Sequence, residues 1–422
     1  MIAVIRKRKA EERESSAADA RLGMWPWSAA SAPSAAAPTP ILRIDSAAHM
    51  QPIRDAAASN KYSMTLGDDW TLLWTFRTPW TTEALKKRLL QKRPFSHRPF
   101  LVNHLAGTLR VASKEHLPEF LRTAGLTDAA PATFRLPEDM ELARAALTRD
   151  PLHDASGLPT WMLKSKQHRN IRPLLNSTSE HLASQSPALL QRRVRPLLLP
   201  GLHRAFDIGI YVLVSSVSPL RIYAYEKALV RVCEKPFPTS AAGFASSADR
   251  SAYVINHYSP LWSLPFFAPF FAQCPGHTDA ACALRAALSA HGHDGAQLWR
   301  KMEAVVSRAL THLKPHAEEG LHRIGLSPAH AFELFRFDFM VDERAQPMLT
   351  EVNISPNMVA AHDEDGKVKA ALLRDTLRIV STRLRTMKAT AASSAGAAAT
   401  REAAVAGGFR RIGRSKGRGR SA

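Results

Sequence analysis

The sequence predicts a mixed α/β fold, of the α/β or α+β type, because strand and helix patterns alternate between its two ends. Residues 208–216 form an apolar run of strand length, and two shorter strands are expected at 220–225 and 229–232. Residues 297–313 repeat apolar side chains with the period of a helix, and residues 367–386 predict a last amphipathic helix. The core is therefore expected to contain both kinds of element.

A hairpin predicted within residues 332–358 is the most informative segment of the chain. Polar and apolar side chains alternate along its two strands, and a polar turn is centred at 343–346. Folding about this turn brings Asp338 opposite Glu351, with Asn353 one pleat away. Two carboxylates and an amide on one sheet face are the oxygen ligands that Mg²⁺ takes beside a phosphate, and the alternative is a hairpin with ordinary surface acids. The other residues that the first strand places on this face are Arg336 and Met340.

A cationic segment at 160–171 predicts a phosphate site. A short apolar strand ends at Lys164, and a polar loop with Lys166 and Arg169 follows. A lysine at a strand end under a cationic loop suits phosphate groups, whereas the alternative is a solvated basic loop. The sequence contains no Gly-x-x-x-x-Gly-Lys run, so a P-loop ATPase is not supported.

The remaining segments are predicted from composition. Residues 82–91 are expected to form a short basic helix, and the Pro-, Gly- and Ala-rich stretches 236–250 and 274–294 are expected to be loops. The second stretch holds cysteines and histidines whose spacing matches no zinc module, so an irregular loop is preferred there. Those residues are Cys274, His277, Cys282, His291 and His293.

Composition restricts the class of protein. The chain has 422 residues with 45% hydrophobic and 22% charged residues, which is typical of globular proteins. Three cysteines are too few for a disulfide scaffold, so a reducing compartment is expected. No apolar run is long enough to span a bilayer. The net charge of +20 favours a polyanionic partner.

The hairpin motif resembles a known family. Phe-Asp-Phe-x-x-Asp, beginning at Phe337, followed by Glu-Val-Asn-x-x-Pro, beginning at Glu351, is similar to the tubulin tyrosine ligase-like family, whose ATP-grasp active site ends in this hairpin. The resemblance implies an ATP-grasp fold in which Asp338, Glu351 and Asn353 hold the Mg²⁺ of Mg-ATP. It also implies that Lys164 contacts the nucleotide phosphates, with Lys166 and Arg169 in the loop above them, and that Gln191 lies at the adenine end.

A second similar stretch covers residues 190–234. The resemblance makes Asp207 the aspartate next to the nucleotide and the acceptor, and Arg231 the arginine that faces the γ-phosphate. The Asp-x-Arg of the family has become Asp207-Ile208-Gly209, so an arginine is missing. Arg221 and Arg204 are the candidates to replace it.

The resemblance covers roughly residues 60–385, and with the composition of the two chain ends it suggests five segments. These are a disordered segment at 1–45, an N-terminal α/β domain at 46–135, a central ATP-grasp domain at 136–235, a C-terminal ATP-grasp domain at 236–385 and a disordered basic tail at 386–422.

The resemblance implies a carboxylate–amine ligase that uses ATP and Mg²⁺. The expected donor is glutamate, and the expected acceptor is the acidic tail of tubulin. The chain is expected to be a cytoplasmic monomer at the cytoskeleton or the cilium, without a membrane partner. One alternative is a catalytically impaired protein that binds microtubules or nucleotide, because Gly209 replaces the arginine and Asn170 replaces a loop glycine. A second is nucleic-acid binding through the basic surface and tail, although the aromatic residues are not interleaved with the cations.

Overall fold

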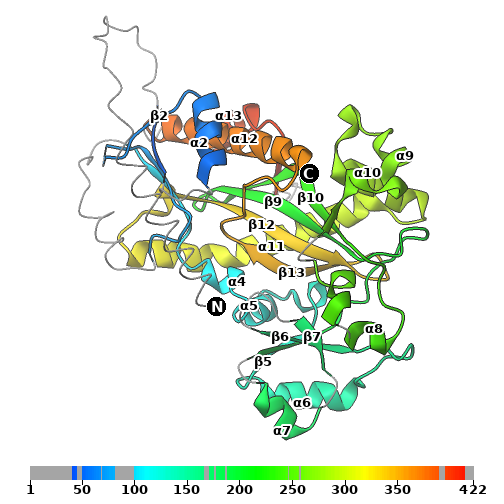
Figure 1. Cartoon of the computed structure of the whole chain (residues 1–422). Coiled ribbons are helices and arrows are strands. Elements are labelled where there is room, and N and C mark those ends of the chain that lie inside the picture. Colours follow the sequence, from blue (N-terminus) through cyan, green and yellow to red (C-terminus); the bar gives the residue numbers. More distant parts are fainter. Residues whose placement is uncertain are drawn as a thin grey trace, which may run out of the picture. The chain divides into compact units, whose positions relative to one another are not determined.

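The computed structural model of the chain describes residues 40–44, 50–67, 69–80, 99–165, 171–174, 177–185, 188–245, 247–255, 258–388 and 395–413 (Figure 1). The chain divides into two compact units. One consists of Met1–Asn103 with Asn357–Ala406, and the other of His104–Pro356 with Gly407–Ala422. The domain boundaries expected at 135 and 235 stay predictions.

The described residues of the first unit form a small parallel sheet and three helices. The sheet order is β4-β3-β1-β2, and the neighbouring strands are parallel. The long helix α12 confirms the helix predicted at 367–386. The Tyr62 hydroxyl donates a 2.9 Å hydrogen bond to the Leu377 carbonyl of this helix. The elements are β1 (Ile41–Ile44), α2 (Gln51–Ser59), β2 (Ser63–Met64), β3 (Leu72–Trp74), β4 (Leu101–Asn103), α12 (Asp363–Lys388) and α13 (Ala395–Ala404). The helix predicted at 82–91 lies outside the described residues.

The second unit begins with a small antiparallel sheet of order β5-β8-β6-β7. Strand β6 confirms the strand predicted before Lys164. Trp161 and Leu163 of β6 join the buried cluster against Ala143 and Ala146 of α6, and Figure 1 shows α6 and α7 beside this sheet. The elements are β5 (Thr133–Leu136), α6 (Met140–Arg149), β6 (Trp161–Ser165), β7 (Ile171–Pro173), α7 (Ser179–Ser184) and β8 (Ala188–Arg192).

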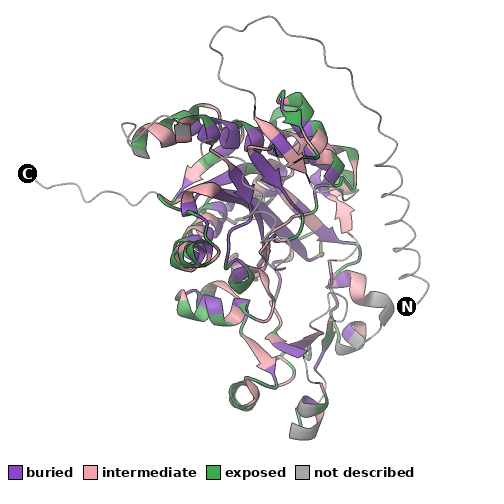
Figure 2. Ribbon diagram, turned by 90° about the vertical axis from the view of Figure 1, so that its left-hand side faces the viewer, coloured by how far each residue is buried: buried purple, intermediate pink, exposed green. Residues whose placement is uncertain are grey.

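A larger antiparallel sheet forms the centre of the second unit. Its order is β11-β10-β9-β12, with β13 paired to β12 and β14 paired to β10. Every residue of β9 is buried, which explains its continuous apolar sequence, and Figure 2 shows the central strands in the buried colour. The two strands predicted at 220–225 and 229–232 are one strand, β10, with an irregularity between Ala224 and Ala228. The strands are β9 (Phe206–Ser216), β10 (Arg221–Cys233), β11 (Tyr258–Pro260), β12 (Ala331–Val341), β13 (Pro347–Asn353) and β14 (Phe409–Ile412).

The helices of this unit extend and correct the prediction. Helix α11 (Gly295–Arg323) contains the predicted 297–313 and continues beyond it. The prediction of a loop at 274–294 is wrong for residues 280–290, which form α10 (Ala280–Ala290). Asp279 caps the first turn of this helix. The loop expected at 236–250 contains α8 (Ala241–Ala245) and most of the 3₁₀ helix η3 (Ser247–Ala252). The other short helices are α4 (Leu109–Ala112), α5 (Leu117–Thr123), η2 (Thr127–Ala129), η4 (Leu261–Ser263), η5 (Pro265–Phe267), α9 (Ala268–Phe271), η6 (Pro275–His277) and η7 (Pro328–His330).

The cysteines also differ from the expectation. Cys274 and Cys282 form a disulfide, which the expected reducing compartment does not favour, and the remaining Cys233 is free and buried. Within the described ranges no group of three or more His, Cys, Asp and Glu side chains is placed to hold a metal.

The basic tail predicted at 386–422 is corrected as well. Residues 395–404 form α13, and β14 pairs with β10 with Phe409 opposite Tyr225. The disordered-tail prediction is therefore wrong for these elements, and 414–422 lie outside the described residues, as does most of the segment 1–45. None of the helices described here is both long enough and apolar enough to cross a bilayer.

Candidate functional site

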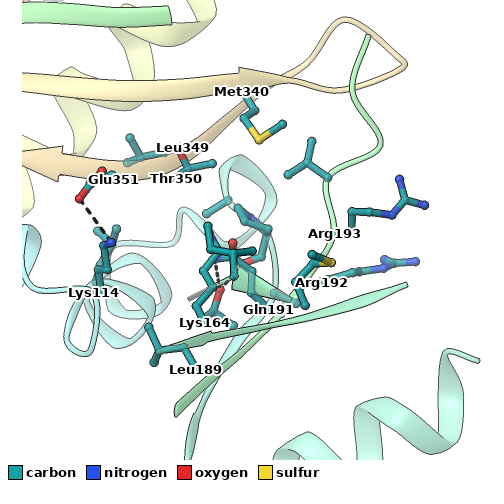
Figure 3. A pocket seen from close by; sticks show the side chains of 18 of the residues that line it. Lys114, Lys164, Leu189, Gln191, Arg192, Arg193, Met340, Leu349, Thr350 and Glu351 are labelled. Atoms are coloured by element: carbon teal, nitrogen blue, oxygen red, sulfur yellow. Dashed lines mark hydrogen bonds and ion pairs between the residues drawn. The ribbon is translucent and has the colours of Figure 1, made fainter. Parts of the chain in front are cut away.

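A cavity of about 560 Å³ lies in the second unit, between the small sheet and the β12–β13 hairpin. Figure 3 shows the hairpin above the cavity and the small sheet below it. Lys164 and Gln191 line it from the small sheet, and Asp338 and Glu351 line it from the hairpin. Segments predicted separately as phosphate-binding and metal-binding therefore face one space.

The hairpin has the predicted register. Asp338 of β12 is paired with Glu351 of β13, and Arg336 is paired with Asn353. Directly opposed residues of antiparallel strands place their side chains on the same face, so the two carboxylates share one face as expected. The Asn353 amide reaches that face too, and its Nδ2 donates to Oδ2 of Asp338 at 3.2 Å.

Arg231 joins the two aspartates of this face. Its Nε lies 2.8 Å from Oδ1 of Asp207, and its Nη2 lies 2.5 Å from Oδ2 of Asp207. The same Nη2 lies 3.1 Å from Oδ2 of Asp338. Burial raises the pKa of Asp207 to about 6, and the attraction of Arg231 opposes this rise. Asp207 and Arg231, predicted as catalytic residues, thus form one buried ion-paired unit at the cavity wall.

Arg336 is a member of this cluster that the sequence placed on the face of Asp338 but did not identify as a site residue. Its Nε donates to Oδ1 of Asp338 at 2.6 Å, and its Nη2 donates to Oδ2 at 2.8 Å. This two-point pairing fixes the plane of the carboxylate. The sequence signal that could have identified Arg336 as a site residue is its position two residues before Asp338, on the same face of an alternating strand.

Two lysines lie at the other side of the cavity. Burial lowers the pKa of Lys164 to about 8, and repulsion by Lys114 adds to this effect while Glu351 opposes it. Lys114 Nζ lies 3.8 Å from Oε1 of Glu351, as the dashed line in Figure 3 shows. An anionic phosphate bound near the two ammonium groups would offset their repulsion and favour the charged form of Lys164.

Gln191 lies on β8, where the adenine end of a nucleotide was predicted. Its Nε2 donates to Oγ1 of Thr133 at 2.8 Å, which fixes the amide at the cavity wall. Arg193 also lines the cavity and is fixed as well, because its Nη2 lies 2.7 Å from Oδ2 of Asp154.

Of four further predicted residues, two lie outside the described residues and two lie away from the cavity wall. Lys166 and Arg169 lie outside the described residues. Arg221 begins β10, at the opposite end of that strand from Arg231, and does not line the cavity. Ten strand residues span about 30 Å, so the predicted catalytic role of Arg221 is corrected. Arg204, the other candidate replacement, also lies off the cavity wall and approaches Oγ of Ser259 at 3.5 Å.

The oxygen donors of the hairpin fit a magnesium ion. Oδ2 of Asp338 accepts from Arg231, Arg336 and Asn353, but Oδ1 accepts only the Nε of Arg336 among the residues described. A carboxylate oxygen has two lone-pair directions, so Oδ1 retains one. Among the described residues, the ion pair of Glu351 is the long contact to Lys114, and 29% of its side-chain surface is accessible. Mg²⁺ needs few protein ligands and keeps water and phosphate for the rest.

Comparison with known proteins agrees with this geometry. A family model described as the tubulin-tyrosine ligase family matches residues 95–389. The chain belongs to this family. The resemblance seen in the sequence is thereby confirmed, and membership implies an ATP-grasp fold, as well as the use of ATP and Mg²⁺ by ligases of the family.

Several relatives are named as tubulin glutamylases. The chain is 27% identical over 329 residues to ttll-15 of Caenorhabditis elegans, described as a probable tubulin polyglutamylase, covering 76% of this chain and 59% of the relative. It is 29% identical over 287 residues to the human tubulin monoglutamylase TTLL4, covering 66% of this chain and 23% of the relative. It is 26% identical over 332 residues to the tubulin polyglutamylase ttll6 of Danio rerio, covering 75% of this chain and 39% of the relative. The chain thus spans less than two thirds of the length of each of these three relatives.

Proposed function

We propose that the chain is an ATP-dependent ligase that joins an amino acid, glutamate, to a carboxylate of an acidic tubulin tail. The observation that carries this proposal is the register of the hairpin, which places Asp338 and Glu351 on one face beside Arg231. The family and the glutamylase names of several relatives support the same reaction class.

The proposed reaction has two steps, phosphorylation of the acceptor carboxylate and then formation of the amide. In the first, an acceptor carboxylate oxygen forms a bond to the γ-phosphorus of ATP, and the bond from that phosphorus to the ADP oxygen breaks. In the second, the donor amine forms a bond to the acyl carbon, the bond from that carbon to the phosphate oxygen breaks, and inorganic phosphate leaves. The amine nitrogen loses a proton as the amide forms.

The cavity residues have separate tasks in this reaction. Lys164 offsets negative charge on the nucleotide phosphates, and Arg231 does the same at the transferring phosphoryl group. Gln191 lies where the base would bind, with Lys166 and Arg169 assigned to the loop over the phosphates. Asp338, Glu351 and Asn353 would hold Mg²⁺, which when bound adds positive charge next to the phosphoryl oxygens. Asp207 holds Arg231 in place through two hydrogen bonds.

The charge of the chain fits the proposed acceptor. A net charge of +20 attracts an acidic peptide over long range and raises the rate of encounter. The expected location is the cytoplasm, at microtubules of the cytoskeleton or the cilium. Salt is expected to weaken this attraction, since exposed charges are screened beyond about 10 Å at ~0.1 M ionic strength.

One observation favours a second candidate, a protein that binds nucleotide or microtubules without turnover. Position 209 carries glycine, so the arginine of the Asp-x-Arg motif is absent from β9. Loss of one such cation typically costs about a hundredfold or more in rate. The two candidates differ in turnover and agree in binding.

The test is incorporation of labelled amino acid into tubulin. The full chain is incubated with Mg-ATP, tubulin and labelled glutamate, glycine or tyrosine, and with tubulin that lacks its C-terminal tails. Transfer of glutamate to intact tubulin alone is the expected result. Glu351→Gln is the inactive variant, and Glu343→Gln, an exposed residue of the same hairpin, is the matched control. Binding of Mg-ATP without transfer of any donor would exclude the ligase and support the second candidate.

A further inference from the structure

Gly209 and Arg336 compete for one volume above the central sheet. A Cβ atom built on Gly209 would lie 2.9 Å from Cδ and 3.2 Å from Nε of Arg336, and 3.0 Å from Oδ1 of Asp338. Real Cβ contacts essentially never fall below 3.0 Å. A side chain at position 209 therefore requires the Arg336 side chain to shift.

Strand register explains why the two positions share this space. Strands β9 and β12 are antiparallel neighbours, in which Gly209 is paired with Asp338 and Tyr211 with Arg336. The Arg336 side chain runs along its strand, crosses over Gly209 and reaches Asp338. A side chain on residue 209 would start directly opposite Asp338 and enter the same volume. A guanidinium group from either strand would thus arrive beside the same carboxylate.

The ion pairs of the cluster leave one nitrogen of the Arg336 guanidinium available for a ligand. Arg231 contacts the carboxylates of Asp207 and Asp338, while Arg336 contacts Asp338 alone. The Arg336 side chain is only 11% exposed, and burying such a charge is costly unless it is paired. Nε and Nη2 of Arg336 are engaged by Asp338, whereas Nη1 makes no hydrogen bond to any residue that the structure describes. Arg336 is not itself among the residues that line the cavity, whereas Asp338, to which it is paired, is. Nη1 remains able to donate to an anionic group that binds against Asp338.

We propose that Arg336 supplies, from β12, the guanidinium that position 209 of β9 lacks, and that its Nη1 contacts the phosphorylated acceptor carboxylate of the ligase reaction. The inference rests on the proposed ligase function. It assigns a catalytic residue to a strand position that the Asp-x-Arg motif does not include. It also explains why Gly209 does not by itself indicate loss of turnover.

The test is an exchange of the two side chains. Four forms of the full chain are compared: wild type, Arg336→Ala, Gly209→Arg, and the double variant with both substitutions. Arg336→Ala is expected to lower the rate of glutamate transfer about a hundredfold, the effect typical of removing one donor to a developing negative charge. Gly209→Arg alone is expected to be inactive and less stable, because its side chain meets Arg336. The double variant is expected to regain at least about tenfold over Arg336→Ala.

Controls separate this effect from folding and nucleotide binding. Arg344→Ala removes an exposed arginine from the turn of the same hairpin and is expected to leave the rate unchanged. The dissociation constant of Mg-ATP is expected to change less than about threefold in Arg336→Ala, since the residue serves the acceptor. A rate of Arg336→Ala within about threefold of wild type would overturn the proposal, as would a folded double variant no faster than Arg336→Ala. If Arg336→Ala does not fold, the double variant decides alone: a rate within tenfold of wild type supports the exchange, and a lower one overturns it.

Thermal unfolding of the four forms distinguishes failure of this inference from failure of the proposed function. If the wild type transfers no amino acid, the ligase proposal fails, but the unfolding midpoints still report on the shared volume. A double variant more stable than Gly209→Arg alone is the expected result. Additive shifts in the midpoints would show that the positions do not exchange, and would overturn the inference independently of turnover.

Discussion

Asp338 and Glu351 are paired across antiparallel strands, and each carboxylate has its own counter-cation. Asp338 is contacted by Arg231 and Arg336, and Glu351 is contacted by Lys114. With Lys164, four cationic side chains meet three carboxylates, the third being Asp207, in this part of the described structure. Arg122, Arg192 and Arg193 also line the cavity, so positive charge is in excess there and suits an anionic ligand. In the proposed ligase, Mg²⁺ held by the hairpin would add further positive charge beside the phosphates of ATP.

Glu351 provides the first prediction. In Glu351→Gln the amide retains the shape of the side chain but loses the charge, so the gain in ATP affinity that Mg²⁺ provides is expected to fall about tenfold or more. The measurement is calorimetric titration with ATP in Mg²⁺ and in a chelator. Glu343→Gln, with a half-exposed side chain in the same hairpin, is expected to behave as the wild type. An unchanged Mg²⁺ dependence in Glu351→Gln would exclude the carboxylate as a ligand.

Lys164 provides a prediction about pH. Its pKa lies near 8, below the ordinary value, because burial disfavours the ammonium form. Phosphate binds the protonated form and raises this pKa, so affinity is full below pH ~8 and is lost as the pH rises through it. The dissociation constant of Mg-ATP is therefore expected to increase by up to about tenfold per pH unit above pH ~8.

An arginine at this position is the control for the pH effect. Lys164→Arg keeps its charge throughout the range, since the guanidinium does not deprotonate in proteins. Its dissociation constant is expected to be nearly independent of pH between about pH 7 and about pH 9.5, whatever its absolute value. The same slope in both proteins would assign the titration to another group.

Glu333 provides a prediction about stability. Its Oε1 lies 2.9 Å from Nδ1 of His104, and its Oε2 accepts the Leu105 N–H at 2.8 Å. His104 has a positive φ of 85°, so this carboxylate holds a backbone turn that a histidine rarely adopts. Glu333→Gln replaces one acceptor oxygen by a donor in a fully buried site. The free energy of unfolding is expected to fall by about 1–3 kcal/mol, measured by urea denaturation.

A surface glutamate gives the matched comparison. Glu319→Gln removes an exposed ion pair with Arg323 on α11 and is expected to change the free energy of unfolding by less than about 0.5 kcal/mol. Equal effects of the two substitutions would contradict the role of the buried pair.

Much of the fold and the hairpin of the site could be predicted because local patterns determine them. Strict alternation fixes which side chains share a face, so the pairing of Asp338 with Glu351 follows once the turn is located. The position of Arg336 over Asp338 could not be predicted. It depends on the empty space at Gly209, on a strand far away in the sequence.

Composition misled the prediction in two segments. The stretch 274–294 contains Pro, Gly, Cys and His, yet its alanine-rich centre forms α10, because alanine has the highest helix propensity. The chain end is rich in Gly and Arg, which is typical of disordered tails, but Phe409 and Ile412 are buried in β14. A short strand of this kind is stabilised by a distant partner, β10, and carries almost no local signal.

The last prediction separates β14 from the basic residues after it. Phe409 packs on Tyr225 with ring centroids 4.8 Å apart, and both are buried. Truncation after residue 406 removes the buried Phe409 and Ile412 and is expected to lower the free energy of unfolding by at least about 3 kcal/mol. Truncation after residue 413 removes only residues beyond the strand and is expected to change it by less than about 0.5 kcal/mol. Both are measured by urea denaturation.

The shorter truncation also decides the tail-based alternative for nucleic-acid binding. Deleting 401–422 would remove β14 together with the cations, so any loss of binding would reflect unfolding as well as charge. Deleting 414–422 removes Arg414, Lys416, Arg418 and Arg420 and leaves the strand in place. If the tail carries such binding, this deletion is expected to weaken it strongly and to reduce its salt dependence, since each phosphate contact contributes about one unit to the slope. Unchanged binding would assign it to the folded body, which also carries excess positive charge.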